Sequence, residues 1–517
     1  MAEKDNDKEA FSFNLIYFII LFFAMAWFSL FPSVLFGYWF FLTFPFTISL
    51  PYLLLMIPLF LILYGIALIS SMISAKIGVW IVYKRLTPPI PGSYPLTLKN
   101  RHTRAFVLTG NVRNFGRWLH YFFHLNFLRA FWLRRCGLKI GKNVKLGRYV
   151  QDDDLIEIGD NTFLAKECVI SGHLMDQTHL TINRTIIGKN VIMENISGSV
   201  GGTVGDNSIF LHVTGAMKGQ ICRGNAIYQG VPCKKVRDND LTPEQIKELK
   251  EKIRKIDKTD FIKQKNAPIK INEKKLFFMK FLIVLGGAIL GLIVPVLYYF
   301  FFKTFYSPTN QFWNILLLSL IPFIFVIAIG FFIAGTILFV KIFLVYYERK
   351  VEIPEGEYEL DDPRAKIFKI KYMLRLFGLR IFRGTPFKIA DTFALRIWGN
   401  VKIGANVKMD DATVDPQYLE VGDFSQIAAG ARVHTHDIIK GKLYIKKVII
   451  GKNVIVGSFG HIKPGVEIAD GSMIAVAAWM RKNRKCKRPA LWVGKPAFEL
   501  PLDVITKAAR LEGKYVD

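Results

Sequence analysis

Two histidines, His173 and His436, carry the clearest chemical signal in this sequence of 517 residues. They stand in the short polar segments Ser171-Gly172-His173 and Thr435-His436-Asp437. An imidazole titrates near neutral pH, so it can take a proton from an attacking hydroxyl or amine while an acyl group is transferred. We expect Asp437 to orient the His436 ring or to raise its basicity through a hydrogen bond. The alternative is that both histidines are only surface or turn residues.

These two histidines belong to a duplicated unit, because the chain aligns with itself at an offset of 263 residues. The offset places Ile140-Gly141-Lys142-Asn143-Val144 on Ile403-Gly404-Ala405-Asn406-Val407, and Ile187-Gly188-Lys189-Asn190-Val191 on Ile450-Gly451-Lys452-Asn453-Val454. It also places His173 on His436, so each copy has one histidine at the same position. The histidines that do not pair in this way are expected to be structural or accessory: His179, His212, His434 and His461.

Both copies contain an apolar residue at every sixth position. These residues are Ile140, Leu146, Ile158, Leu164, Ile170, Ile187 and Met193 in the first copy, and Ile403, Met409, Val421, Ile427, Val433, Ile450, Val456, Ile462, Ile468 and Ile474 in the second. A period of six differs from the periods of helices and ordinary strands, and it predicts a parallel β-helix with about 18 residues in each triangular coil. The register is broken between Ile170 and Ile187 and between Val433 and Ile450. Each break predicts a protruding loop that carries the histidine of its copy.

Three long segments without charged residues or histidine predict membrane spans: Ala10 to Ala75, Phe281 to Phe302 and Thr304 to Val340. The polar stretch from Lys303 to Gln311 predicts a turn between two spans. By the duplication, the first segment should turn near Phe40 to Ile48, so each copy begins with a two-helix hairpin. We expect spans at about 14–39, 50–75, 277–302 and 312–340.

Basic residues predict the orientation, because they cluster at the span ends that lead to the repeats. These residues are Lys76, Lys84, Arg85, Lys274, Lys275, Lys280, Lys341, Arg349 and Lys350. We therefore expect a multi-pass protein of the cell membrane with both β-helices in the cytoplasm. Arginines interleaved with aromatic residues after the second span predict a segment on anionic lipid headgroups rather than on nucleic acid: Arg113, Arg117, Arg129, Arg134 and Arg135 with Trp118, Phe122, Phe123, Phe131 and Trp132.

The predicted organisation has six parts. They are a transmembrane hairpin over 11–83, a β-helix domain with the interfacial segment over 84–236, a helical linker over 237–275, a second transmembrane hairpin over 276–347, a second β-helix domain over 348–501 and a C-terminal tail over 502–517. The net charge of +28 predicts an anionic binding partner. The five cysteines lack C-x-x-C spacing, so neither a disulfide framework nor a zinc site is expected, and no metal is predicted.

The hexads, the loop histidines and the closing Gly230-Val231-Pro232-Cys233 and Gly494-Lys495-Pro496-Ala497 resemble the left-handed β-helix hexapeptide acyltransferases. The order of span pairs and hexads over the whole chain also resembles the membrane-bound C-terminal region of poly-lysine synthetase and related non-ribosomal peptide synthetase terminal domains. Matching stretches include Pro91-Gly92-Ser93-Tyr94, Arg383-Gly384-Thr385-Pro386 and Asp415-Pro416-Gln417-Tyr418. The chain departs from those synthetases because it has two units rather than three and neither an adenylation nor a carrier domain.

The resemblance implies a general-base role for His436 and His173, assisted by Asp437, toward an acyl-CoA or carrier-bound donor that is not held tightly. It also implies donor-binding residues, namely Lys482, Arg484, Lys487, Lys218, Gly494 and Gly230. A solvated basic surface is the alternative for the cation run of Lys482 to Lys487.

The sequence therefore favours a membrane-bound acyl- or aminoacyl-transferase that forms amides or esters. The expected partners are the bilayer, the acyl donor, a carrier protein or adenylation enzyme, and further copies of the chain. The alternative is a non-catalytic membrane scaffold that docks synthetase or glycan-modifying enzymes. The neighbouring gene would discriminate between peptide synthesis and sugar acylation.

Overall fold

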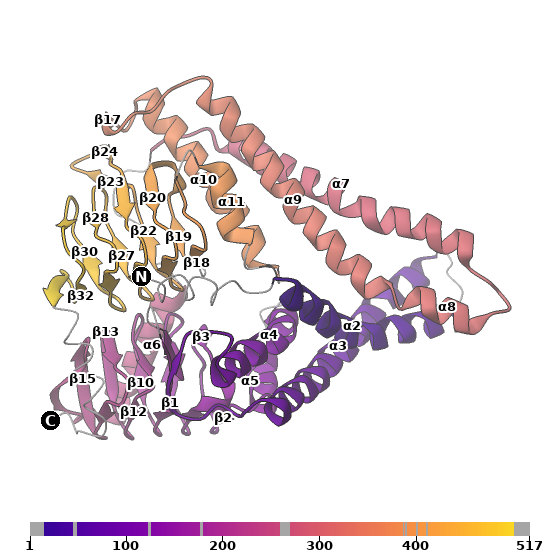
Figure 1. Cartoon of the computed structure of the whole chain (residues 1–517), viewed down its shortest axis with the longest axis horizontal. Helices are drawn as coiled ribbons and strands as arrows, with labels where there is room; N and C mark the ends of the chain where they lie inside the picture. Colours follow the sequence, from indigo (N-terminus) through magenta and orange to yellow (C-terminus); the bar gives the residue numbers. More distant parts are fainter. Residues whose placement is uncertain are drawn as a thin grey trace.

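The computed structural model describes residues 15–44, 49–121, 126–175, 179–258, 269–385, 387, 390–399, 402–409 and 412–500. It contains two units of the same order, each a long helical hairpin followed by short helices and a β-helix. Figure 1 shows the first unit in purple and the second in orange and yellow, with the β-helices side by side and the two hairpins converging near α8. The predicted C-terminal tail lies outside the described residues.

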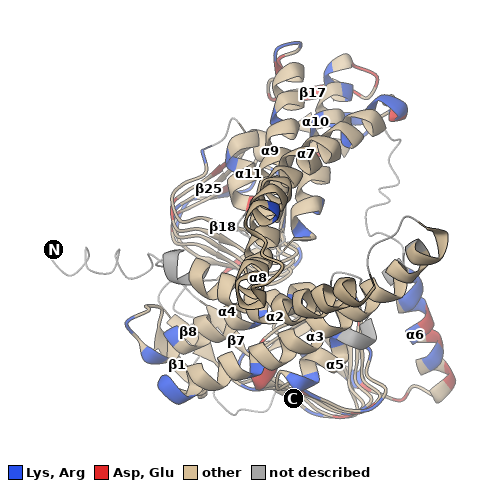
Figure 2. Ribbon diagram, turned by 90° about the vertical axis from the view of Figure 1, so that its right-hand side faces the viewer, with Lys and Arg blue, Asp and Glu red and all other residues tan. Residues whose placement is uncertain are grey.

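The predicted hairpins are present. The first is made of α2 (Leu15–Thr43) and α3 (Leu50–Arg85), and the second of α7 (Glu273–Phe305), α8 (Gln311–Leu318) and α9 (Ile321–Glu348). By length and composition, four helical segments are long and apolar enough to cross a membrane: Ile19–Thr43, Leu50–Arg85, Glu273–Phe305 and Gln311–Glu348. In Figure 2, α7 and α9 are tan over most of their length, because they are almost free of charged residues.

Small residues bring the helices of the second hairpin together. A Cβ added to Gly287 of α7 would lie 2.7 Å from Oγ1 of Thr336 in α9, so only glycine allows this close approach. The two hairpins also contact each other. Nε1 of Trp27 donates a hydrogen bond to the carbonyl oxygen of Ser319 at 2.9 Å.

The β-helices have the coil length that the hexads predict. In the second, Ile449 pairs with Glu467 and Glu467 pairs with Lys485, so equivalent residues of successive coils are 18 apart. Leu419 pairs with Val448, 29 residues later, because 11 further residues protrude between these two strands. The predicted parallel β-helix is therefore confirmed, and its left-handedness stays a prediction.

Three parallel sheets form the faces of the second β-helix, with orders β18-β21-β26-β29-β32-β33, β19-β22-β27-β30 and β20-β25-β28-β31, in which only the last strand, β33, is antiparallel. Its strands are β18 (Lys408–Met409), β19 (Thr413–Val414), β20 (Leu419–Val421), β21 (Gln426–Ile427), β22 (Arg432–Val433), β25 (Val448–Ile450), β26 (Ile455–Val456), β27 (His461–Ile462), β28 (Glu467–Ile468), β29 (Met473–Ile474), β30 (Trp479–Met480), β31 (Lys485–Cys486), β32 (Leu491–Val493) and β33 (Phe498–Leu500). The hexad residues of these strands, such as Val433, Ile450 and Ile462, are buried inside the coils.

The first β-helix has corresponding strands. They are β2 (Lys139–Ile140), β3 (Tyr149–Val150), β4 (Ile156–Ile158), β5 (Phe163–Leu164), β6 (Val169–Ser171), β9 (Thr185–Ile187), β10 (Ile192–Met193), β11 (Gly198–Val200), β12 (Thr203–Val204), β13 (Ile209–Ala216), β14 (Ile221–Cys222), β15 (Ala226–Gly230) and β16 (Lys234–Asp238). Asparagines such as Asn143 and Asn190 adopt a positive φ at the corners, a conformation that asparagine tolerates better than most residues.

The protruding segments are β-hairpins rather than irregular loops. The first consists of β7 (His173–Met175) and β8 (His179–Ile182), and the second of β23 (His436–Ile439) and β24 (Lys442–Ile445). The strand after each membrane hairpin adds a third member, β1 (Gly92–Pro95) on β8 and β17 (Gly356–Glu359) on β24. Each histidine therefore starts a strand that is tied to the end of the membrane hairpin.

The predicted interfacial segment forms α4 (Arg101–Tyr121) and α5 (Asn126–Arg135), and the second unit has α10 (Pro363–Arg383) and α11 (Ala390–Trp398) in the same place. Several of its arginines have partners within the protein, and contact of the segment with lipid headgroups stays a prediction. Arg113 and Arg117 pair with Asp153, and Arg129 donates hydrogen bonds to the carbonyl oxygens of Gly147 and Arg148. Trp132 is buried as well, whereas Phe131 and Arg135 are exposed. Phe122 and Phe123 lie outside the described residues.

The predicted helical linker begins as expected. Helix α6 (Pro243–Lys258) starts with a capping box, in which the amide of Gln245 donates to Oγ1 of Thr242 and the amide of Thr242 donates to Oε1 of Gln245. Its buried residue Ile253 packs on the first β-helix.

The two β-helices contact each other. Tyr149 and Val169 of the first form a buried cluster with Phe459 and Ala477 of the second. The rings of Tyr149 and Phe459 meet edge to face with centroids 5.4 Å apart.

Candidate active sites

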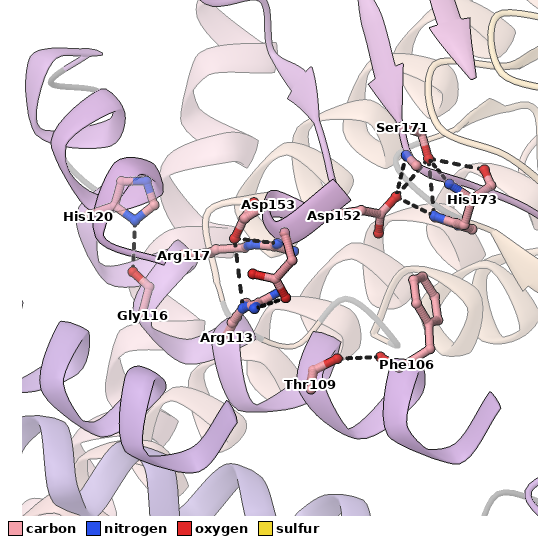
Figure 3. A network of polar contacts seen from close by, with 12 residues as sticks. Phe106, Thr109, Arg113, Gly116, Arg117, His120, Asp152, Asp153, Ser171 and His173 are labelled. Atoms are coloured by element: carbon pink, nitrogen blue, oxygen red, sulfur yellow. Dashed lines mark hydrogen bonds and ion pairs between the residues drawn. The ribbon is translucent and has the colours of Figure 1, made fainter. Parts of the chain in front are cut away.

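Each unit contains an Asp–His pair at the start of its protruding hairpin. In the first unit, Nδ1 of His173 lies 2.6 Å from Oδ2 of Asp152 (Figure 3). In the second, Nδ1 of His436 is hydrogen-bonded to Oδ2 of Asp415. A carboxylate accepts from the ring N–H, so this contact holds the lone pair of each neutral ring at Nε2. The side chains of His173 and His436 are 20% and 18% exposed, so both are reachable from solvent.

Backbone and hydroxyl groups hold the carboxylates in place. Oδ2 of Asp152 also accepts from Oγ of Ser171 and from the amide of Gly172, both at 2.9 Å. Oδ2 of Asp415 accepts from the amide of Thr435 at 3.1 Å. These donors stabilise the ionised carboxylate next to the ring.

The residue that orients His436 is Asp415, not Asp437 as the sequence predicts. Asp437 pairs instead with Lys463, whose Nζ lies 2.9 Å from its Oδ2. Neighbouring residues of a strand point to opposite sides, so Asp437 turns away from the ring that precedes it. The offset of 263 places Asp152 on Asp415, and this equivalence is the sequence signal that identifies the orienting residues.

The electrostatics of the two carboxylates agree with a charged acceptor. Burial would raise the pKa of Asp152, but the charge of His173 and the hydrogen bonds from His173 and Ser171 outweigh burial and lower it to about 2. The pKa of Asp415 is also lowered, against burial, by His436 and His434 and by the amide of Thr435. Both groups are therefore carboxylates at neutral pH.

Aromatic residues of the first short helix of each unit pack against the histidine. The ring of Phe106 in α4 lies 4.8 Å from that of His173. In α10, the rings of Phe368 and Tyr372 each lie 4.9 Å from that of His436. These contacts restrict the orientation of the imidazole, so the short helices help to position the ring.

In each unit, an arginine of the same short helix contacts the segment that follows the aspartate of the Asp–His pair. In the first unit, Arg113 contacts Asp153 and Asp154, and Nη2 of Arg117 lies 2.9 Å from Oδ2 of Asp153 (Figure 3). In the second, Arg375 donates to Oε1 of Gln417 at 3.1 Å and also contacts Glu348 of α9. The segment that follows each orienting aspartate is thereby fixed to a helix next to the membrane hairpin.

A polar and aromatic surface lies beside His436, and we name it the His461–Trp479 face. His461 and Trp479 are adjacent in the sheet β19-β22-β27-β30, and their rings are stacked at 5.3 Å. Nζ of Lys495 lies 4.4 Å from the centre of the Trp479 ring, and the ring of His434 lies 5.1 Å from that of His461. Burial lowers the pKa of His434 to about 4 and that of His461 to about 2, so both rings are neutral at pH 7.

The first unit lacks this surface. The offset of 263 places Val169 on Arg432 and Gly198 on His461, and the closing segments align Val231 with Lys495. Val169 packs against Phe459 and Ala477 of the second β-helix. The two units therefore share the Asp–His pair but differ in the face beside it.

Three of the predicted donor-binding residues surround β31. Lys482, Arg484 and Lys487 are exposed on the turns before and after β31. Nζ of Lys482 lies 5.8 Å from the centre of the Tyr444 ring in β24, whereas Arg484 covers Trp492 at 5.1 Å.

The other predicted donor-binding residues lie at coil ends. Gly494 precedes Lys495, and its carbonyl oxygen accepts from the amide of Trp479 at 2.9 Å, so it borders the His461–Trp479 face. Lys218 and Gly230 occupy corresponding places in the first unit, on the turn before β14 and at the end of β15. The sequence gives no common signal for Lys463, Lys495, Trp479 and His461, because the coil brings them together from separate hexads.

Comparisons with known proteins give one match in sequence and several in structure. No protein-family model matches the chain. The protein described as "Putative acetyltransferase YvoF" from Bacillus subtilis (strain 168) is 27% identical over 119 residues, which cover 22% of this chain and 69% of that protein. A maltose O-acetyltransferase from Clostridium difficile 630 covers 28% of this chain and 92% of its own, with 20% identity and a TM-score of 0.24.

A serine acetyltransferase in complex with coenzyme A from Brucella abortus strain S19 covers 35% of this chain and 76% of its own, with 12% identity and a TM-score of 0.19. The sequence similarity to YvoF supports an enzyme of the acyltransferase class.

Proposed function

We propose that this chain is a membrane-bound acyltransferase that uses an acyl-CoA or carrier-bound thioester as donor and a hydroxyl or amine as acceptor. The observation that carries the proposal is the Asp–His pair, repeated in both units with Nδ1 on the carboxylate. The pair leaves Nε2 as the proton acceptor at the edge of a rigid β-helix. The similarity to an acetyltransferase and the predicted hexapeptide family agree with this chemistry.

The proposed reaction moves one acyl group. Nε2 of the histidine takes the proton of the acceptor N–H or O–H, and the acceptor atom bonds to the thioester carbonyl carbon. The C–S bond then breaks, and the thiolate leaves with the proton that the imidazolium returns. Asp415 or Asp152 stabilises the imidazolium while it exists.

The second unit is the stronger candidate for donor binding. Its His461–Trp479 face offers stacked rings and the ammonium of Lys495, which suit a ligand with a planar base and phosphates. The first unit has valine and glycine at the equivalent positions. We therefore keep the expectation that His436 contributes more than His173.

The location, the donor and the partners predicted from the sequence are part of the same proposal. We expect both β-helices to lie in the cytoplasm, where acyl-CoA and carrier proteins are found, because basic residues flank the four candidate spans on the side of the β-helices. The resemblance to peptide synthetase terminal domains favours an aminoacyl donor, and further copies of the chain and anionic lipids are expected partners.

Transfer activity of the purified full chain in detergent tests the proposal. With acetyl-CoA and a panel of amine and hydroxyl acceptors, the wild type should release free coenzyme A in an acceptor-dependent manner. General-base catalysis is worth roughly 10²- to 10⁴-fold, so His436→Ala should lower turnover by about that factor, and His173→Ala should lower it less. Each variant leaves a largely buried carboxylate without its imidazole partner, so the thermal midpoint should fall, and turnover is compared at a temperature at which both variants are folded.

Full activity in the double variant would contradict the enzyme proposal. So would a wild type that neither binds nor consumes acetyl-CoA or an acylated carrier protein. Either result would leave the scaffold as the remaining function.

A further inference from the structure

One group of side chains in the second unit has the composition of a metal site. Among the residues that the structure describes, Asp415, His434 and His436 bring one donor atom each to within 4.8 Å of one another. Asp415 precedes the short helix Pro416–Tyr418, His434 follows β22 and His436 opens β23. The coil of the β-helix therefore assembles three donors that lie on separate segments.

One oxygen of this group is buried and has no hydrogen-bond partner. The Asp415 side chain is 3% exposed. Its Oδ2 accepts from the amide of Thr435 and from His436, whereas its Oδ1 has no hydrogen-bond partner. A buried carboxylate oxygen without a donor is costly, so it requires an explanation. A bound cation would supply the missing partner.

The first unit has the counterparts of two of the three donors but not of His434. The offset of 263 places Ser171 on His434, while Asp152 and His173 match Asp415 and His436. Oγ of Ser171 is hydrogen-bonded to Asp152 at 2.9 Å and lies 3.1 Å from Nδ1 of His173. The Asp–His pair therefore exists without a third nitrogen donor in the first unit, and the second unit adds that donor.

We propose that Asp415, His434 and His436 bind a divalent transition-metal ion of the zinc class. Two imidazoles and one carboxylate are a ligand set that zinc uses when a fourth position stays open. Bonds of about 2.0–2.2 Å separate the donors of a tetrahedral site by roughly 3.3–3.6 Å, so the three side chains would have to move closer together to hold the ion. Imidazole ligands also suit Co²⁺ and Ni²⁺, whereas Mg²⁺ and Ca²⁺ prefer oxygen donors.

The ion has a consequence for the second unit that rests on the proposed function. An imidazole that binds a metal through one nitrogen carries its proton on the other, so it has no lone pair left for the acceptor. Metal binding would therefore remove the base of the second unit and leave that of the first unit intact. The site would make the two copies respond differently to zinc-class ions.

Binding of Co²⁺ to the full chain tests the site without any measurement of transfer. The chain is purified without a histidine tag, stripped with a chelator and titrated with Co²⁺ in detergent. We expect one tight Co²⁺ per wild-type chain with the visible absorption of a tetrahedral or five-coordinate ion. His434→Ser should weaken this binding by roughly 100-fold or more, because it removes a direct ligand, while changes beyond the ligands already cost about 10- to 100-fold.

His173→Ala is the matched control, because it removes the equivalent histidine of the unit that lacks the third donor. It should bind Co²⁺ as the wild type does. Serine stands at the equivalent position of the first unit, so His434→Ser is expected to fold, and equal thermal midpoints of the two metal-free proteins would verify this. Unchanged Co²⁺ affinity in a folded His434→Ser variant would overturn the proposal.

Zinc X-ray absorption of the wild type provides a second test that needs no variant. The expected spectrum shows nitrogen and oxygen neighbours at about 2.0–2.2 Å with the scattering pattern of imidazole. A sulfur shell at about 2.3 Å, or a chelator-stripped wild type that retains no zinc after incubation with Zn²⁺ and gel filtration, would overturn the site. Loss of transfer activity would not bear on these readouts, so failure of the metal site and failure of the enzyme proposal are distinguishable.

Discussion

Asp152 lies 2.6 Å from Nδ1 of His173 although 21 positions separate the two residues in the chain. The segment between them runs through one coil of the β-helix and returns to the same corner. The same path brings Asp415 to His436 in the second unit. The orienting partner of each histidine is therefore supplied by the coil and not by the neighbouring residue.

Exchange of the orienting carboxylate should impair the base without unfolding the chain. We expect Asp415→Asn to lower turnover by roughly 10²- to 10⁴-fold, because an amide neither holds the ring with Nδ1 protonated nor stabilises the imidazolium. Turnover and the thermal midpoint are the measurements.

Asp437→Asn is the matched control for that variant. Asp437 pairs with Lys463 and not with the ring, so its loss should not change turnover appreciably. An Asp437→Asn variant as impaired as Asp415→Asn would restore the role that the sequence predicts for Asp437.

Buried His120 should make the first unit sensitive to acid. Its ring is 3% exposed and stacks on Trp132, Nδ1 donates to the carbonyl oxygen of Gly116, and Nε2 has no hydrogen-bond partner. Burial lowers its pKa from 6.5 to about 4. The unfolded chain therefore takes up a proton as the pH falls below about 6.5, whereas the folded chain does so only near pH 4.

The second unit provides the test substitution for this effect. Phe382 stacks on Trp398 there, four residues after Gly378, as His120 stands four residues after Gly116. His120→Phe should be as stable as the wild type at pH 7.5 and more stable by up to about 3 kcal/mol near pH 4, because the protonation penalty is gone. Thermal midpoints at the two pH values measure this difference. An identical pH dependence of both proteins would contradict it.

Periodicity explains why so much of the fold is predictable from the sequence. Inward-facing residues such as Val433, Ile450 and Ile462 must be apolar at every sixth position. Because three hexads make one coil, this spacing predicts the coil length. The spans are equally direct, because charges are absent over the full width of a bilayer. The start of α6 follows from Thr242 and Gln245 alone, since a capping box is local.

Contacts between distant segments explain what the sequence analysis missed. The sequence of a basic and aromatic helix is the same whether its arginines bind lipid phosphates or buried carboxylates. The partner of Arg117 is Asp153, which lies 36 positions away in the chain. Lys463 and Lys495 lie near Trp479 because successive coils stack. No sequence pattern indicates a role for His434. Only the structure does so, because Oδ1 of the neighbouring Asp415 is buried and has no hydrogen-bond partner.

Cysteine labelling should report the orientation of the membrane hairpins. All five native cysteines are buried, so they should give little background with a membrane-impermeant maleimide. In intact cells, we expect label on Thr309→Cys in the turn between α7 and α8, and none on Lys487→Cys on the second β-helix. Permeabilised cells should label both variants. Label on Lys487→Cys in intact cells would place the β-helices outside the cytoplasm.

The donor should be held by Lys495 more than by the cation run that the sequence predicts. The ammonium of Lys495 lies over Trp479 on the face next to His436, whereas Lys487 is exposed beyond β31 on another sheet. A charge-assisted hydrogen bond to a phosphate is worth about 1.5 kcal/mol or more, so Lys495→Ala should raise the KM for acyl-CoA by roughly 10-fold. Its kcat should change little, because the bond is present before and during transfer.

Lys487→Ala is the control of equal charge and should leave KM unchanged. If Lys487→Ala raises KM and Lys495→Ala does not, the donor phosphates bind along the predicted run from Lys482 to Lys487 and not on the His461–Trp479 face.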